Sequence, residues 1–255
     1  MTIFEISFFG LTLAPTWYGL MYALGFIICY EFVKKYGYLR PGEVDSLLFS
    51  IFIGVLFGGR IGYVLLYNLP YYSEHLSEIF AFWKWGMSFH GGAIWVIIAI
   101  FFHAWRHNSK VFDISDPLVT ILPIALGLWR IGNLINMELL GYSPYYGPLA
   151  IIRDGVSYFP SPLLECFLEG WILLIIMLLW KWYESVKERR PGYASAIFLI
   201  WYGVFRLFAE LFRLPDAHIG YLYGSHWITL GMIYTVPMLI GGGIIYLVAR
   251  NKMRN

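Results

Sequence analysis

Charged side chains are scarce in this chain of 255 residues. Asp, Glu, Lys and Arg make up 13% of it, whereas 59% of the residues are hydrophobic and 20% are aromatic. A soluble globular domain carries about 25% charged residues. A soluble fold with so few charges would leave a large apolar surface in water, whereas lipid can cover that surface. The composition therefore excludes an ordinary soluble protein and indicates an integral membrane protein.

Other features are absent as well. The net charge is only +2 and no block of basic residues occurs, so we expect no nucleic-acid partner. The two cysteines, Cys29 and Cys166, stand in apolar stretches without metal or redox spacing, so we expect buried thiols, no metal site and no cofactor. The first basic residue, Lys34, follows the first apolar run, unlike the pattern of a cleaved signal peptide. We therefore expect residues 1–14 to be mature and non-cytoplasmic.

Long apolar stretches dominate what is present. A membrane-spanning helix needs about 20 apolar residues. Seven stretches meet this need, at residues 16–34, 45–67, 87–105, 116–140, 162–181, 193–213 and 226–249. The connections are short and no repeat is apparent, so we predict one all-α integral membrane domain over residues 1–255. Two longer connections, approximately 68–86 and 141–161, are rich in Tyr, Pro and Gly, which suits ordered outer-side loops over a site.

Basic residues set the expected orientation, because Lys and Arg gather in cytoplasmic connections. With seven transmembrane helices, twelve basic residues fall on one side, in alternate connections and the C-terminal tail. The opposite loops hold only Lys84 and Arg153, with Arg213 at a helix end. We therefore expect the N-terminus outside and the C-terminus in the cytoplasm.

Three arginines stand inside apolar stretches, where a charged side chain is costly and usually functional. They are Arg60, Arg130 and Arg206. At a rise of about 1.5 Å per residue, Arg130 and Arg206 lie about 20 Å from the cytoplasmic ends of their helices. Arg60 lies about 10 Å from the outer end of its helix. In a hydrocarbon core about 30 Å thick, all three fall in the outer half, which predicts a site facing the outer leaflet.

Polar residues at helical spacing accompany two of these arginines. One group consists of Tyr202, Arg206, Glu210 and Arg213. In the other, Arg130 and Asn133 are three residues apart, with Asn136 and Glu138 just beyond them. We expect Glu210 to pair with Arg206 or Arg213, and Glu138 to pair with Arg130. Three or four cations would then meet two carboxylates, and an unbalanced cationic pocket attracts an anion such as phosphate. Structural ion pairing is the alternative, especially for Arg60, whose neighbouring glycines favour close helix packing.

Two further side chains are predicted at the same depth. His90 begins the third apolar stretch and is followed by Gly91 and Gly92, which allow another backbone or a ligand to come close. A histidine titrates near neutral pH and can act as a base, although a buried structural histidine is the alternative. Tyr18 begins the first stretch, where an interfacial aromatic residue is equally expected.

The segment from Arg130 to Gly141 reads RIGNLINMELLG. Its Arg, Gly, Asn, Asn, Glu and Gly residues resemble, at matching spacing, the signature of the bacterial prolipoprotein diacylglyceryl transferases. Further segments resemble that family in the same order along the chain, namely Trp17–Tyr22, Gly58–Val64, Gly86–Gly92, Tyr202–Arg206 and the residues from Glu210 to Pro215. The resemblance covers roughly residues 16–250.

This resemblance implies a reaction. The family transfers the diacylglyceryl group of phosphatidylglycerol to the lipobox cysteine thiol of a preprolipoprotein signal peptide, which forms a thioether and releases glycerol phosphate. It also implies a multi-pass protein of the bacterial inner membrane, with its active site toward the periplasmic leaflet. Arg130 and Arg206 are then predicted to stabilise the leaving phosphate. His90 is predicted to deprotonate the acceptor thiol, or to orient it if the thiol ionises another way. The predicted substrate-binding residues are Tyr18, Arg60, Asn133, Asn136, Glu138, Gly141, Tyr202, Glu210 and Arg213.

Three places depart from the family pattern. Trp129 stands where the family usually has glycine, and Trp95 stands where a small residue is usual. Residues 159–165 replace the usual His-Pro-Ser-Gln-x-Tyr-Glu with Phe-Pro-Ser-Pro-Leu-Leu-Glu. Two alternatives therefore stay open, a protein of the same fold with a different acceptor, and a non-enzymatic lipid-binding protein or transporter. A transporter usually shows internal repeats, which this sequence lacks.

Overall fold

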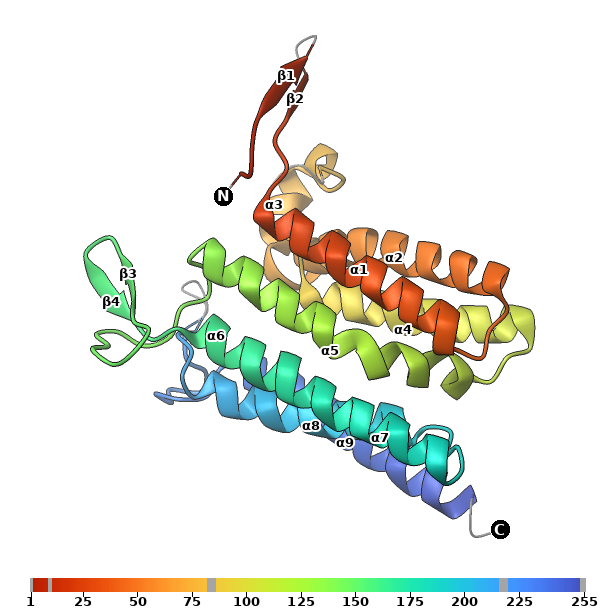
Figure 1. Cartoon of the computed structure of the whole chain (residues 1–255). Coiled ribbons are helices and arrows are strands. Elements are labelled where there is room, and N and C mark those ends of the chain that lie inside the picture. Colours follow the sequence, from red (N-terminus) through yellow and green to blue (C-terminus); the bar gives the residue numbers. More distant parts are fainter. Residues whose placement is uncertain (1, 9–10, 82–85, 216–219, 253–255) are drawn as a thin grey trace. The chain divides into compact units, whose positions relative to one another are not determined.

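The chain is mainly helical in the computed structural model, which describes residues 2–8, 11–81, 86–215 and 220–252. The helices are α1 (Trp17–Tyr36), α2 (Pro41–Tyr67), α3 (Leu69–Glu74), the 3-10 helix η1 (Leu76–Glu78), α4 (Phe89–His107), α5 (Val111–Ile135), α6 (Ser161–Glu165), the π-helix η2 (Cys166–Ile172), α7 (Leu173–Val186), α8 (Tyr193–Glu210) and α9 (Leu230–Lys252) (Figure 1). Two antiparallel strand pairs accompany them, β1 (Ile6–Phe8) with β2 (Leu11–Leu13), and β3 (Ile151–Arg153) with β4 (Val156–Tyr158).

Each of the seven predicted apolar stretches contains one long helical segment, and α6, η2 and α7 form the fifth without a break. Five segments are long and apolar enough to cross a membrane, namely Gly42–Leu65, Val111–Ile135, Ser161–Val186, Tyr193–Glu210 and Leu230–Asn251. The chain is therefore a multi-pass membrane protein. The count of seven stays a prediction, because α1 and α4 are not among these five segments of the described residues.

One predicted helix end is wrong. The stretch 116–140 was expected to be helical throughout, but α5 ends at Ile135. Met137 and Leu139 have φ values of 53° and 56°, and this left-handed conformation cannot continue an α-helix. The second half of the predicted signature is therefore a turn, which places Asn136 and Glu138 off the helix.

The chain divides into two compact units, and one of them contains Met1–Phe32 and Asp116–Asn255. In this unit α8 packs along α9, and a buried core joins α5, α7 and α8. That core consists of Leu126, Leu173, Met177, Ala194, Phe198 and Tyr202. Both cysteines are buried in this unit, as predicted, with Cys29 8% and Cys166 4% exposed.

The other unit is Val33–Ser115, in which α2 packs along α4. Glycines allow the close approach of these two helices, since a Cβ atom on Gly62 would lie 2.6 Å from the backbone α-carbon of Gly91. This confirms the close packing that the glycines around Arg60 predicted. The structure describes each unit by itself, and the single-domain organisation stays a prediction.

Candidate functional site

The site begins with a close contact between α5 and η2. A Cβ atom on Gly170 would lie 2.7 Å from the backbone α-carbon of Gly127, so neither helix tolerates a side chain at this crossing. Gly170 directly follows Glu169, and Gly127 lies one helical turn before Arg130. The two glycines therefore bring a carboxylate of η2 within reach of an arginine of α5. Glu169 also lies in a π-helix, a local distortion that is frequent at functional sites.

Two arginines share two carboxylates at this crossing. Arg130 contacts Glu165 through Nε at 2.8 Å and Glu169 through Nη2 at 3.3 Å. Arg206, from α8, contacts both carboxylates through Nη1, each at 3.3 Å. Arg206 also forms an ion pair with Glu210, as its i, i+4 spacing predicted. We call these five residues the charge network.

The charge network is deeply buried. Glu165 and Glu169 have no exposed surface, Arg130 is 5% exposed and Arg206 is 8% exposed. Removing one partner from a buried ion pair leaves an uncompensated charge, which costs about 3–5 kcal/mol. The shared carboxylates therefore hold the two guanidinium groups next to each other.

The sequence-based pairing of Arg130 was wrong. Its expected partner, Glu138, instead accepts hydrogen bonds of 3.4 Å from the side-chain amides of Asn133 and Asn136. The expected excess of cations is also wrong, because Glu165 and Glu169 were not considered. With them, the charge network and its neighbour Arg213 contain three arginines and three glutamates. An anion would therefore be bound by unused hydrogen-bond donors rather than by net positive charge.

Some polar atoms remain available at the charge network. Among the described residues, Nη1 of Arg130 takes part in none of these ion pairs, although the group carries two N–H donors. Asn133 is 2% exposed, and its Oδ1 accepts no hydrogen bond from the described part of the chain. A buried polar atom without a partner is costly, so the position of Asn133 Oδ1 favours a polar ligand.

The C-terminal end of α8 extends the charge network toward α9. Glu210 accepts a 2.6 Å hydrogen bond from the Thr229 hydroxyl and contacts Arg213 at 3.4 Å. A Cβ atom on Gly231 would lie 2.6 Å from the Glu210 carboxylate, so this glycine makes room for it. Arg213 lies beyond the end of α8, and burial together with the neighbouring Arg206 lowers the pKa of its guanidinium. A negative charge beside Arg213 would therefore be stabilising.

Tyr18 lies beside the same part of α5. The indole N–H of Trp129 donates a hydrogen bond to the Tyr18 hydroxyl, and the guanidinium of Arg130 lies 5.0 Å from the centre of the Trp129 ring. A Cβ atom on Gly132 would lie 2.9 Å from the Tyr18 ring, which explains the need for glycine there. Trp129 therefore links Tyr18, a predicted substrate-binding residue, to Arg130, a predicted catalytic residue.

Tyr202 and Gly141 occupy structural positions. Tyr202 is 4% exposed and stacks on Phe198 within the core, with ring centroids 5.7 Å apart. A Cβ atom on Gly141 would collide with the Phe212 carbonyl oxygen, because Gly141 forms a β-bridge with Arg213. Substrate contact by either residue stays a prediction.

An aromatic stack explains one departure from the family pattern. Phe159 stacks on Tyr142 with ring centroids 5.2 Å apart, and on Phe212 with centroids 5.4 Å apart. The Phe159 N–H also donates to the Tyr142 carbonyl at 3.0 Å. The aromatic residue at position 159 thus joins the loop before α6 to the segment after α8.

Two predicted site residues belong to the other unit. Arg60 is fully buried, and it donates hydrogen bonds to the carbonyl oxygens of Ile79 at 2.9 Å, Glu78 at 2.8 Å and Gly86 at 3.3 Å. These contacts anchor the segment after η1, so Arg60 has a structural role in its unit. Its contact with substrate stays a prediction.

His90 is the second residue of α4, and its side chain lies outside the described residues. The following Gly91 packs against the backbone of Gly58 and Gly62 in α2. Helix packing therefore accounts for this glycine, which does not by itself mark a ligand site. The role of His90 as a base stays a prediction.

Glu165 and Glu169 were not among the predicted site residues. The signal was present, since both are carboxylates inside a predicted transmembrane stretch, at the i, i+4 spacing that places side chains on one helix face. Within the described part of the chain, no three His, Cys, Asp or Glu side chains gather as metal ligands. The chemistry available is that of paired guanidinium groups, which suit the binding of phosphate oxygens.

Comparisons with known proteins agree with this chemistry. The family described as prolipoprotein diacylglyceryl transferase matches residues 5–248. A phosphatidylglycerol–prolipoprotein diacylglyceryl transferase from Pasteurella multocida is 42% identical over 256 residues, covering 97% of this chain and 91% of that protein. Proteins of the same name from Francisella tularensis and Buchnera aphidicola are each 38% identical, the former covering 93% of this chain and 90% of that protein, the latter 90% of each. The chain therefore belongs to the prolipoprotein diacylglyceryl transferase family.

Proposed function

We propose that this chain transfers the diacylglyceryl group of phosphatidylglycerol to a cysteine thiol of a prolipoprotein, and that the charge network is the catalytic centre. Membership of the family supports the reaction, and the names of the relatives supply the two substrates. The observation that carries the assignment of the site is the pairing of Arg130 and Arg206 through shared, fully buried carboxylates.

The arginines act on the leaving group. The acceptor sulfur attacks the glyceryl carbon, a carbon–sulfur bond forms, and the carbon–oxygen bond to the phosphate breaks. Negative charge then accumulates on the leaving phosphate oxygen, and preorganised donors that face this charge lower the barrier. Nη1 of Arg130 is available for a phosphate oxygen, and Oδ1 of Asn133 can accept a hydrogen bond from a headgroup hydroxyl.

The acceptor thiol must lose its proton. A cysteine thiol has a pKa of about 8.5, so a base is needed to generate the thiolate at neutral pH. We assign this role to His90, because an imidazole can take up the proton and later release it. The products are then the thioether and glycerol phosphate, and the proton is held by the imidazole.

We further propose seven transmembrane helices, with the N-terminus outside and the C-terminus in the cytoplasm of a bacterium. The distribution of basic residues supports this orientation. It places the charge network toward the periplasmic leaflet of the inner membrane, where the signal-peptide cysteine of the acceptor, in its lipobox, would arrive.

An in vitro transfer assay tests the proposal. Purified protein receives phosphatidylglycerol and a cysteine-containing acceptor peptide, and glycerol phosphate release and thioether formation are measured together. Arg130→Lys keeps the charge but loses the planar fork, so we expect transfer to fall about a hundredfold or more. His90→Ala should also abolish transfer, whereas the exposed Arg106→Lys serves as the matched control. Full activity of Arg130→Lys would remove Arg130 from the leaving-group role.

A further inference from the structure

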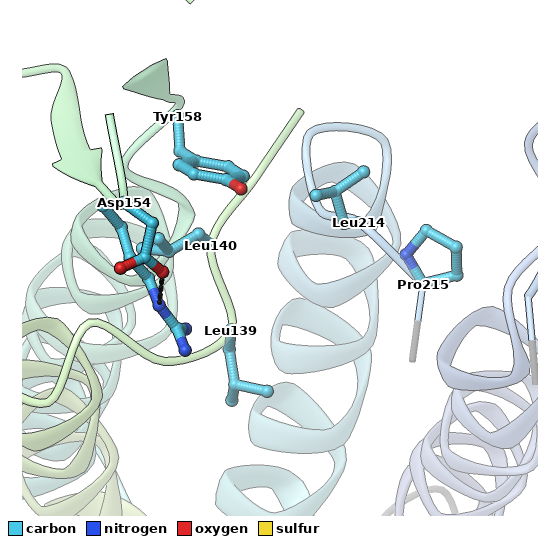
Figure 2. A pocket seen from close by; sticks show the side chains of 7 residues that line it. Leu139, Leu140, Asp154, Tyr158, Leu214 and Pro215 are labelled. Carbon is cyan, nitrogen blue, oxygen red and sulfur yellow. Dashed lines mark ion pairs between the residues drawn. The ribbon is translucent and has the colours of Figure 1, made fainter. Parts of the chain in front are cut away.

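A pocket lies next to the charge network, outside the candidate membrane-spanning segments. It has a volume of about 390 Å³. Its lining combines polar atoms with apolar side chains, the latter from Leu139, Leu140, Tyr158, Leu214 and Pro215 (Figure 2). Arg153 and Asp154 from the β3–β4 hairpin stand at its rim. The volume falls in the range of about 300–1,000 Å³ that is usual for ligand sites.

Two of the residues that line the pocket directly follow predicted site residues in the chain. Leu139 follows Glu138, and Leu214 follows Arg213, which contacts Glu210. Backbone contacts join the two segments, since the Leu214 N–H donates to the Leu140 carbonyl at 3.4 Å, and Gly141 bridges Arg213. A molecule bound in the pocket therefore contacts residues that directly follow Glu138 and Arg213, two of the predicted substrate-binding residues.

The chemistry of the walls selects the kind of occupant. The one cation at the rim, Arg153, pairs with Asp154 at 3.6 Å, as the dashed line in Figure 2 marks, so the pocket has no net charge. A phosphate headgroup would need unpaired donors. Acyl chains would lie along the apolar helices, whereas this pocket lies between Ile135 and Ser161 and beyond Glu210. A neutral, extended peptide segment offers both apolar side chains and backbone hydrogen-bonding groups, and it fits this mixed lining better.

We propose that this pocket binds the acceptor, by seating the apolar, extended residues next to the cysteine that receives the lipid. This inference rests on the proposed function, because it takes the prolipoprotein as the acceptor. The apolar side chains of the lining would contact the side chains of the peptide, and the polar atoms of the lining would contact its backbone.

The conformation of Leu139 is fixed by a neighbouring residue. Its φ of 56° is unusual for a large side chain, and such strain persists only where the surrounding structure enforces it. The Leu139 carbonyl accepts a 2.6 Å hydrogen bond from the Ser161 hydroxyl, which fixes this conformation and presents the side chain to the pocket.

The backbone conformation allows a matched pair of variants. Asparagine tolerates the left-handed region, so Leu139→Asn removes the apolar side chain while keeping the turn. Leu149 has a φ of 60°, is 71% exposed and does not line the pocket. Leu149→Asn therefore makes the same substitution at the same backbone conformation, but outside the pocket. We expect Leu139→Asn to raise the KM for the acceptor peptide about tenfold, with the KM for phosphatidylglycerol unchanged. Leu149→Asn should change neither KM.

A binding measurement keeps the test independent of transfer. A photo-reactive benzoylphenylalanine is placed at Leu214 or, as control, at Leu149, and the probe is an acceptor peptide whose cysteine is replaced by serine. Selective crosslinking at position 214 supports the proposal even if Leu139→Asn is poorly folded. Equal crosslinking at both positions, or a KM change for phosphatidylglycerol instead of the peptide, overturns it. If wild-type protein crosslinks the peptide but transfers no lipid, the proposed function fails and the docking site stands.

Discussion

Gly127 in α5 and Gly170 in η2 lie in backbone contact, at the crossing that brings Arg130 to Glu169. Backbone atoms cannot move aside as the end of a flexible side chain can. We therefore expect Gly170→Val to separate the two helices, lower stability by about 1–3 kcal/mol and reduce transfer. Thermal unfolding in detergent and the transfer assay measure both effects. The control is Gly243→Val, since Gly243 in α9 has open space around its Cβ position. Equal effects of both variants would contradict the proposed crossing.

Glu169 should act by positioning the arginines. Glu169→Gln keeps the size of the side chain but removes the charge that Arg130 and Arg206 share. We expect transfer to fall about a hundredfold, equivalent to about 2.7 kcal/mol, because both guanidinium groups lose a buried counter-charge. The transfer assay with the exposed Glu188→Gln as control measures this. A Glu169→Gln protein that unfolds normally and transfers lipid at the wild-type rate would show that Glu165 alone suffices.

Trp129 should matter through its indole N–H as well as its ring. Trp129→Phe keeps an aromatic ring near Arg130 but removes the hydrogen bond to Tyr18, so we expect a loss of about 1 kcal/mol in stability. Trp129→Gly, which restores the residue usual in the family, removes the whole side chain and should cost about 3 kcal/mol. Thermal unfolding compares the two with Trp182→Ala, a 66% exposed tryptophan. A larger loss for the phenylalanine variant would exclude this explanation.

Asp116 should stabilise the start of α8. Its carboxylate accepts hydrogen bonds from the backbone N–H groups of Gly192 at 2.8 Å and Ser195 at 3.1 Å, and from the Ser195 hydroxyl at 2.7 Å. Gly192 has no side chain with which to cap the helix, so the aspartate of α5 supplies this function. We expect Asp116→Ala to lower stability by about 2 kcal/mol, measured by thermal unfolding. Glu188→Ala is the control, and equal stability of the two variants would refute the cap.

The sequence predicted the helices better than the details of the site. Long apolar runs identify the helical segments because lipid requires both length and apolar composition. The i, i+4 rule identified the Arg206–Glu210 pair, since both residues lie on one helix. The partners of Arg130 come from a segment more than 30 residues away along the chain, and periodicity within one helix cannot reveal them.

The turn after α5 and the two strand pairs were also beyond the sequence analysis. Met137 and Leu139 adopt left-handed conformations that neither residue type favours, so tertiary contacts rather than local preference determine this turn. The need for glycine at position 141 has a structural reason in the nearby Phe212 carbonyl oxygen, and substrate contact by Gly141 stays a prediction. Each strand of the two pairs is only three residues long, which is too short for an alternating apolar pattern to identify it.

The charge network has a consequence for how the protein assembles in the bilayer. Before packing, α5 carries the charge of Arg130 alone in this region, and the segment α6–η2 carries those of Glu165 and Glu169. Each separate helix would hold charges that lipid cannot solvate, at about 2.5 kcal/mol or more per residue near the membrane centre. Apolar surfaces give helices no preference for one another over lipid tails. Mutual neutralisation of these charges therefore favours the association of α5 with the segment α6–η2 in the bilayer. The residues that are proposed to perform the chemistry thus also determine which helices become neighbours.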